Sequence, residues 1–164
     1  MSEFTRMIDL RGIGNAPLRL EARADECAAL ARRFAIVAVE RFAAEVSLIP
    51  EGPVVTAKGR IAAAVVQSCA VSGEDLPVVI DEPVTLRFVP ETAPTAAEIE
   101  LSVDELDEIP YTGTAFDLGE ALAQSLALAI DPFLVGPRAE EARRMAGLLA
   151  EGASNPFAAL KGKF

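Results

Sequence analysis

The sequence predicts an α+β fold: one domain with a curved antiparallel sheet, a long central hairpin in that sheet, one N-terminal helix and two C-terminal helices packed on it. Three observations lead to this prediction. The 164 residues fit a single domain and are 51% apolar, which is enough for one core. Alternating apolar residues fill the middle of the chain, whereas helical spacing appears nearer its ends. No repeat or linker divides the chain, so we expect a domain over residues 1–152 and a tail over 153–164.

The N-terminal part is expected to supply a strand and a helix. Residues 3–10 can form the strand, and residues 24–34 the helix. Asp25 and Glu26 suit the positive end of that helix. Its apolar face, at helical spacing, consists of Cys27, Leu30, Ala31 and Phe34. Cys27 is therefore interpreted as a small core residue.

The long hairpin is predicted from alternation over two consecutive runs. Period-two spacing begins near Arg41 and stops at the turn 50–53, after which the run 54–72 begins. One face of this run consists of Val55, Ala57, Ile61, Val65 and Cys69, and the opposite face begins with Thr56, Lys58 and Arg60. Residues 72–75, Ser-Gly-Glu-Asp, are typical of a hairpin turn.

The returning strand is predicted over residues 76–90. Leu86 and Phe88 share one face of it. Pro83 indicates a kink or a bulge, because proline cannot donate to a central ladder. Residues 97–102, AEIELS, predict a further short strand at an edge of the sheet.

Two helices are predicted after the sheet. The first covers residues 114–130, because Thr114 and Asp117 have the spacing of a capping box and Pro132 stops the helix. Its inner stripe consists of Leu118, Leu122, Leu126 and Ala129, and Leu122 is expected to be structural. The last helix is predicted to begin near Pro137.

The acidic residues are concentrated in one segment. Between Phe88 and Pro137 there are ten acidic residues and no Lys or Arg, and these ten are Glu91, Glu98, Glu100, Asp104, Glu105, Asp107, Glu108, Asp117, Glu120 and Asp131. The rest of the chain holds all 15 basic residues and the other 15 acidic ones, so the segment carries the whole net charge of −10. Such a block repels phosphate and attracts basic proteins. The alternative interpretation is a solvated loop that aids solubility.

Composition excludes several kinds of site. The chain has no histidine, which excludes Ser-His-Asp and Cys-His catalysis and the HExxH zinc site. No glycine pattern of the phosphate-loop or dinucleotide type occurs. Two cysteines are too few for a disulfide framework. Charged residues interrupt every apolar stretch, so we expect a soluble, cytoplasmic protein that does not enter the membrane.

Three stretches together resemble the YceD family, whose members are linked to accumulation of large-subunit ribosomal RNA. These stretches are VVQSCAVSGEDLPVVIDEPVTLRFVPE, FDLGEALAQSLALAIDP and NPFAALKGKF. The resemblance extends from about Val54 to the end, and the order of the stretches carries it rather than any single motif. It implies a role in ribosome biogenesis. It implies no catalytic residue, because no catalytic activity is established for the family.

The chain departs from the family at Cys69. Many relatives have C-x-x-C where this chain has Cys69 and Ser72, and some carry further Cys or His residues downstream. A structural zinc site usually needs four such ligands, so we expect no metal and no other cofactor. No histidine partner and no nearby Lys or Arg stands ready to activate Cys69 as a nucleophile. Cys69 is therefore interpreted as a packed, structural thiol on the sheet.

Two functional hypotheses follow, beside the plainer one of a stabilising binding partner with no ribosomal role. The first is a non-enzymatic assembly factor whose acidic residues bind a basic ribosomal protein or a pre-ribosomal particle, through Glu98, Glu100, Asp104, Glu105, Asp107 and Glu108. Weak, salt-sensitive contact with ribosomal RNA is assigned to Lys58, Arg60, Lys161 and Lys163. The alternative is a metal-dependent nuclease or phosphatase acting on precursor RNA through the carboxylates of Asp104–Glu108. These crowd one short loop without a cation nearby, so the first hypothesis is preferred and the protein is not expected to be an enzyme.

Overall fold

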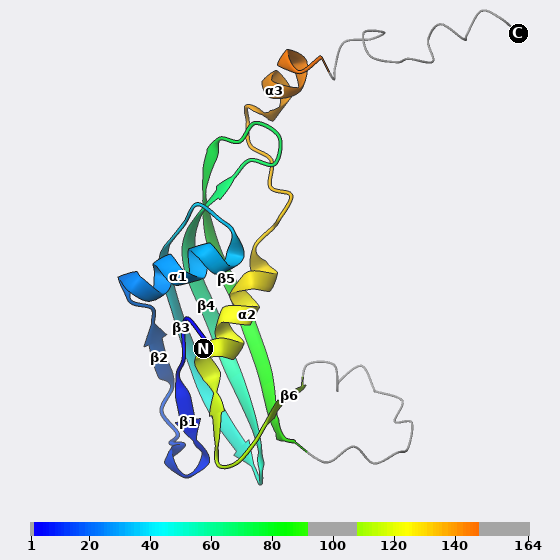
Figure 1. Cartoon of the computed structure of the whole chain (residues 1–164). Helices are drawn as coiled ribbons and strands as arrows, with labels where there is room; N and C mark the ends of the chain where they lie inside the picture. The colour runs from blue at the N-terminus through cyan, green and yellow to red at the C-terminus, as the bar shows by residue number, and fades with distance from the viewer. Residues whose placement is uncertain (1, 92–107, 148–164) are drawn as a thin grey trace, which may run out of the picture.

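An open sheet of five strands, with two helices on one of its faces, forms the centre of the computed structural model (Figure 1). The structure describes residues 2–91 and 108–147. The strand order is β2-β3-β4-β5-β6, and β1 and β7 form a separate two-stranded sheet. The α+β prediction is confirmed. The expected tail at 153–164 and the expected strand at 97–102 lie outside the described residues.

The elements have the following bounds. The strands are β1 (Met7–Asp9), β2 (Leu18–Glu21), β3 (Ala38–Glu51), β4 (Val54–Ser68), β5 (Asp75–Pro90), β6 (Glu108–Tyr111) and β7 (Ala115–Asp117). The helices are α1 (Ala24–Phe34), α2 (Leu118–Ala129) and α3 (Ala139–Met145), and a short 3-10 turn covers Leu10–Gly12. The first predicted helix therefore agrees with α1 at both ends.

The strands β3, β4 and β5 form the long antiparallel core of the sheet. The β4–β5 register is unbroken from the pair Val55 and Phe88 to the pair Ser68 and Asp75. The predicted inner face of β4 is buried as expected, whereas Lys58 and Arg60 are exposed on the outer face. The buried side chains of this sheet face α1 and α2, which together make the core.

The predicted kink or bulge at Pro83 was wrong. Pro83 lies opposite Arg60 within the unbroken β4–β5 ladder, and the register shift of the sheet is in β3, between Val39 and Arg41. The direction of the hydrogen bonds in this ladder explains why a proline is tolerated at position 83. The Cys69 N–H donates to the Glu74 carbonyl, so the backbone N–H and C=O groups of even-numbered residues of β5 point toward β4. Those of odd-numbered residues, Pro83 included, point away from β4. A proline whose nitrogen faces away costs no β4 hydrogen bond.

Helix α2 begins at Leu118, four residues after Thr114, where the sequence predicted its start. Residues Ala115–Asp117 pair instead with β1, as β7. Asp117 then caps the helix, because its carboxylate accepts the Glu120 N–H at 3.0 Å and also the Arg6 N–H at 2.9 Å. Long-range strand pairing therefore overrides the local capping signal.

Two further expectations about the sheet need correction. The β5–β6 pair is parallel, so the sheet is mostly rather than wholly antiparallel. Of the two C-terminal helices, α2 packs on the sheet, whereas α3 lies beyond the tip of the β4–β5 hairpin (Figure 1). The chain between them, residues 130–138, runs beside that tip.

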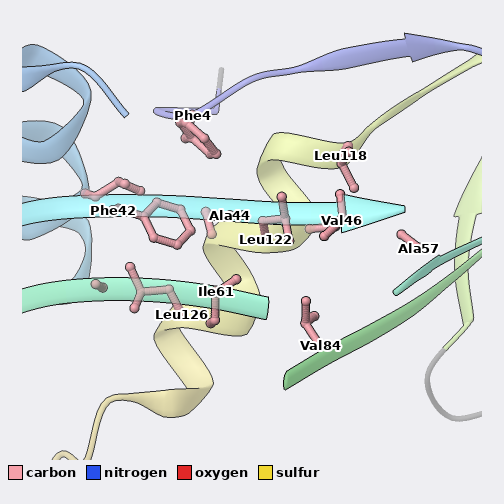
Figure 2. Close-up of a cluster of buried hydrophobic side chains, with 14 of the residues drawn as sticks. Phe4, Phe42, Ala44, Val46, Ala57, Ile61, Val84, Leu118, Leu122 and Leu126 are labelled. Carbon is pink, nitrogen blue, oxygen red and sulfur yellow. The ribbon is translucent and has the colours of Figure 1, made fainter. Parts of the chain in front are cut away.

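The leucine stripe of α2 closes the core. Figure 2 shows Leu118, Leu122 and Leu126 directed toward the sheet, and all three side chains have no exposed surface. Phe4 lies above the same cluster, 5.2 Å from Phe42 between ring centroids. Gly119 permits this arrangement, because a Cβ atom there would lie 2.2 Å from the Phe4 carbonyl oxygen. No helix in the described part of the chain has the length and hydrophobicity that crossing a bilayer requires.

The leucine stripe yields a stability prediction. Leu122→Asp should prevent folding, because an unpaired carboxylate in a fully buried site costs several kcal/mol out of a total stability of about 5–15 kcal/mol. Leu128→Asp on the same helix is the matched control, since Leu128 is 88% exposed. Circular dichroism during urea unfolding should show a cooperative transition for the control only. Cooperative folding of Leu122→Asp would contradict the packing described.

Candidate partner-binding surfaces

Of the six acidic candidates for partner binding, Glu108 is the one among the described residues. It lies on β6 and forms an ion pair with Arg87 of β5. The other five lie outside the described residues and are Glu98, Glu100, Asp104, Glu105 and Asp107. Glu108 therefore already has a cationic partner within the sheet, and the binding role of all six stays a prediction.

The acidic block lacks cations along the sequence but not in space. Glu120 of α2 meets Arg33 of α1, with Oε1 2.7 Å from Nη2. Asp117 caps α2, and Asp131 accepts the Phe133 N–H at 2.9 Å. Four of the ten carboxylates, counting Glu108, thus hold the fold together.

Glu120 is strongly stabilised in its charged form. The Arg33 guanidinium lowers the pKa of Glu120 to about 2, and hydrogen bonds from Ser2 and Gln124 act in the same direction against partial burial. Arg33 also binds Glu3, at 2.9 Å. This ion-pair cluster joins the N-terminal segment to both helices on the covered face of the sheet.

The two described candidates for RNA contact lie on the open face of the sheet. Lys58 and Arg60 are both exposed on β4, but Arg60 pairs with Asp81 of β5 at 2.9 Å. Neighbouring arginines on this face are paired as well, Arg19 with Glu45 at 2.6 Å and Arg41 with Glu21 at 3.7 Å. Lys161 and Lys163 lie outside the described residues. The open face therefore alternates in charge and offers phosphate little net attraction.

Cys69 is buried at the hairpin tip, as expected, with 4% of its surface exposed. Its pKa is nevertheless lowered, by hydrogen bonds from Gly136 and Ser72 rather than by the His, Lys or Arg partners considered in the sequence. Its Sγ accepts the N–H groups of Gly136 and Ser72, each at 3.3 Å, and these bonds lower the pKa of the thiol to about 6. The sequence gives no signal of this, because the donors are backbone amides and one comes from 67 positions away. In Cys27, by contrast, burial raises the thiol pKa.

The surroundings of Cys69 do not fit a metal ion. The polar groups at its sulfur are backbone N–H donors, which add no ligand, whereas a structural zinc site uses four Cys or His ligands. Within residues 2–91 and 108–147, no three Cys, His, Asp or Glu side chains come together as a metal site would need. The thiol instead fastens residues 131–138 to the tip, together with the bonds from Ala70 N to Leu134 O and from Gln67 Nε2 to Asp131 O.

Sequence reasoning did not identify a groove between β5 and α2. Its apolar lining includes Ile61, Val84, Leu86, Ile109, Ala121 and Leu128, and the carboxylates of Glu82 and Glu108 also border it. The signal that pointed toward it was the presence of Pro77 and Pro83 within β5, since such residues are typical of a strand with one unpaired edge. We call this surface the β5 groove.

Residues 57–162, about two thirds of the chain, match the family model described as large ribosomal RNA subunit accumulation protein YceD. The chain belongs to the YceD family. Comparisons with curated proteins and with solved structures found no match. The YceD region begins within β4 and takes in the hairpin tip, β5, β6 and α2. The family name implies a role in accumulation of large-subunit ribosomal RNA.

The Glu120–Arg33 pair predicts a pH-dependent stability. The folded pKa of Glu120 is depressed to about 2 from an ordinary 4.5, so its contribution is fully present above pH 4.5 and is lost as pH falls toward 2. Glu120→Gln should lower the free energy of unfolding by about 1–2 kcal/mol at pH 7, since the pair is partly exposed. The free energies of unfolding of both proteins, measured by urea titration between pH 7 and pH 2, should become equal at the acidic end. A difference in unfolding free energy between the two proteins that stays the same at every pH would contradict the stabilising role given to the Glu120–Arg33 pair.

Cys69 predicts a local loss of order without any loss of metal. Cys69→Ala should lower the free energy of unfolding by about 1–2 kcal/mol, because few atoms are removed. It should also speed amide exchange at Gly136, whereas the matched Cys27→Ala should leave that amide unchanged. Elemental analysis of the purified protein should find negligible zinc. Stoichiometric zinc that leaves upon Cys69→Ala would refute this assignment.

Proposed function

We propose that this protein is a non-enzymatic factor in biogenesis of the large ribosomal subunit. It supports accumulation of large-subunit ribosomal RNA by binding a basic ribosomal protein or an assembly intermediate. The observation that carries the proposal is the YceD match over residues 57–162. Within that region lies the block of ten carboxylates without a Lys or Arg.

Charge argues for a protein partner rather than for direct recognition of RNA. A net charge of −10 repels the phosphate backbone, whereas basic ribosomal proteins carry the opposite charge. The arginines on the open face of the sheet are held in ion pairs, so contact with ribosomal RNA is weak and secondary. In the proposal, the acidic residues 98–108 supply the main attraction.

The chemistry of the described residues also favours a binding protein. The chain has no histidine to move a proton, and Cys69 is buried with amides, not a base, beside its sulfur. A nuclease would need carboxylates converging on paired metal ions. Magnesium-dependent cleavage of precursor ribosomal RNA that disappears in an Asp104–Glu108 variant would favour the enzymatic alternative instead.

The acidic residues should be required for particle binding but not for folding. We expect replacement of Glu98, Glu100, Asp104, Glu105 and Asp107 by Gln or Asn to leave the unfolding transition unchanged and to weaken co-sedimentation with large-subunit precursor particles. Adding Glu108 to the set should cost a little stability, because it also breaks the Arg87 ion pair. Binding of the wild type should weaken as salt rises.

A control variant removes three exposed carboxylates elsewhere, through Glu40→Gln, Glu51→Gln and Glu140→Gln. These three lie outside the acidic segment, so the control should co-sediment like the wild type. If the five-residue variant co-sediments normally at low and moderate salt, the acidic segment only aids solubility.

A further inference from the structure

Along one edge of the sheet, backbone groups of β5 have no partner strand among residues 2–91 and 108–147. Strand β6 pairs only with Arg87–Pro90, so among the described residues no strand lies beside residues 75–86. Figure 1 shows β6 beside the end of β5 that is far from the hairpin tip. Unpaired edges of this length are templates for another strand.

The ladder fixes which groups point outward. The Glu74 carbonyl accepts from Cys69 of the β4 side, whereas the Glu91 N–H donates to Tyr111 on the β6 side. The backbone N–H and C=O groups of the odd-numbered residues of β5 therefore point away from β4 throughout. Pro77 and Pro83 belong to this outward set, so the N–H donors left on this edge are those of Asp75, Val79, Asp81 and Thr85, and the last three lie along the middle of the strand.

The β5 groove runs beside this edge, on the covered face of the sheet. Its volume is about 450 Å³. Val84 and Ile61 form its floor beneath α2, and Figure 2 shows both side chains on the helix side of the sheet. Leu128 of α2 rises at its border with 88% of its surface exposed. A side chain that is so apolar and so exposed beside open backbone is suited to covering by a partner.

The charge of this edge selects the partner. Between residues 74 and 91, β5 and its flanks contain Glu74, Asp75, Asp81, Glu82 and Glu91 against one basic residue, Arg87, which is paired with Glu108. Glu82 is exposed at the groove and forms no ion pair with any described residue. A strand docked here would meet apolar lining in the groove and carboxylates along its rim.

The geometry points to β5 as the docking edge for an extended, basic segment of the partner protein. The segment adds to the sheet beside residues 75–86, receives hydrogen bonds from Val79, Asp81 and Thr85, and places alternate apolar side chains in the β5 groove. Its Lys or Arg side chains pair with carboxylates such as Glu82. This inference rests on the proposed function, because it specifies how a basic ribosomal protein is held.

The structure offers a variant that blocks the edge without disturbing the fold. Val79→Pro removes an outward N–H and puts a ring in the path of a docked strand, but leaves the β4 ladder complete, as Pro77 and Pro83 do. Val79→Ala is its control, since it removes the exposed side chain and keeps the N–H. Leu128→Arg adds repulsion against a basic segment at the groove, and Leu128→Glu changes the same position with the opposite charge.

Binding is measured by co-sedimentation with large-subunit precursor particles over a range of protein concentrations, at fixed low salt. We expect Val79→Pro and Leu128→Arg to bind about tenfold more weakly or worse, which corresponds to about 1.4 kcal/mol. Val79→Ala should stay within about twofold of the wild type, and Leu128→Glu should bind better than Leu128→Arg. Unfolding curves confirm that each variant is folded.

A photo-crosslinking amino acid at position 79 identifies what lies against the edge. Crosslinks to a Lys- or Arg-rich segment of a ribosomal protein support the inference, whereas crosslinks to RNA alone overturn it. If the wild type co-sediments and a folded Val79→Pro binds equally well, the docking edge is refuted while the proposed function stands. If the wild type itself does not co-sediment with the particles, both the docking edge and the proposed function are refuted.

Discussion

The unbroken pairing of β4 with β5 is the constraint on which the other features depend. It sets which side chains enter the core, because every second residue of β4 faces the helices. The same pairing places the turn at Cys69 beyond the end of the sheet, where residues 131–138 form hydrogen bonds with it. It also turns the nitrogens of Pro77 and Pro83 away from β4, so that the β4 side of β5 is fully paired, whereas among the described residues no strand lies beside residues 75–86 on its other side. The core, the tip and the β5 edge thus follow from one register.

Local signals in the sequence were sufficient where an element depends on its own residues. The bounds of α1 and the buried face of β4 could be read from spacing alone, since a helix or strand with one apolar face shows its period directly. Local sequence signals gave the wrong prediction where contacts with distant residues determine the structure. Thr114 and Asp117 have the spacing of a helix cap, yet pairing with β1 makes 115–117 a strand. Pro83 looked like a break because its ladder direction is not encoded locally.

The candidate site shows the same division. The concentration of acidic residues is visible in the sequence, but not that Arg33 and Arg87 from earlier elements meet Glu120 and Glu108. Cys69 was correctly placed in a buried position, whereas its acidity depends on the Gly136 amide, which folding brings to the sulfur. The open edge of β5 is a property of strand order, and strand order follows only from the assembled sheet.

The pairing of β1 with β7 has a consequence for synthesis of the chain. The Arg6 amide and the Asp117 carboxylate that join these ends are 111 positions apart, so the contact forms only after residue 117 has been made. Until then the strands β2 to β5 have emerged, but the leucines of α2 have not arrived to cover them. An apolar sheet without its cover is prone to aggregate or to be captured by a chaperone. The slow step in maturation is therefore expected to be closure of the N-terminal segment over α2, the contact of longest sequence separation.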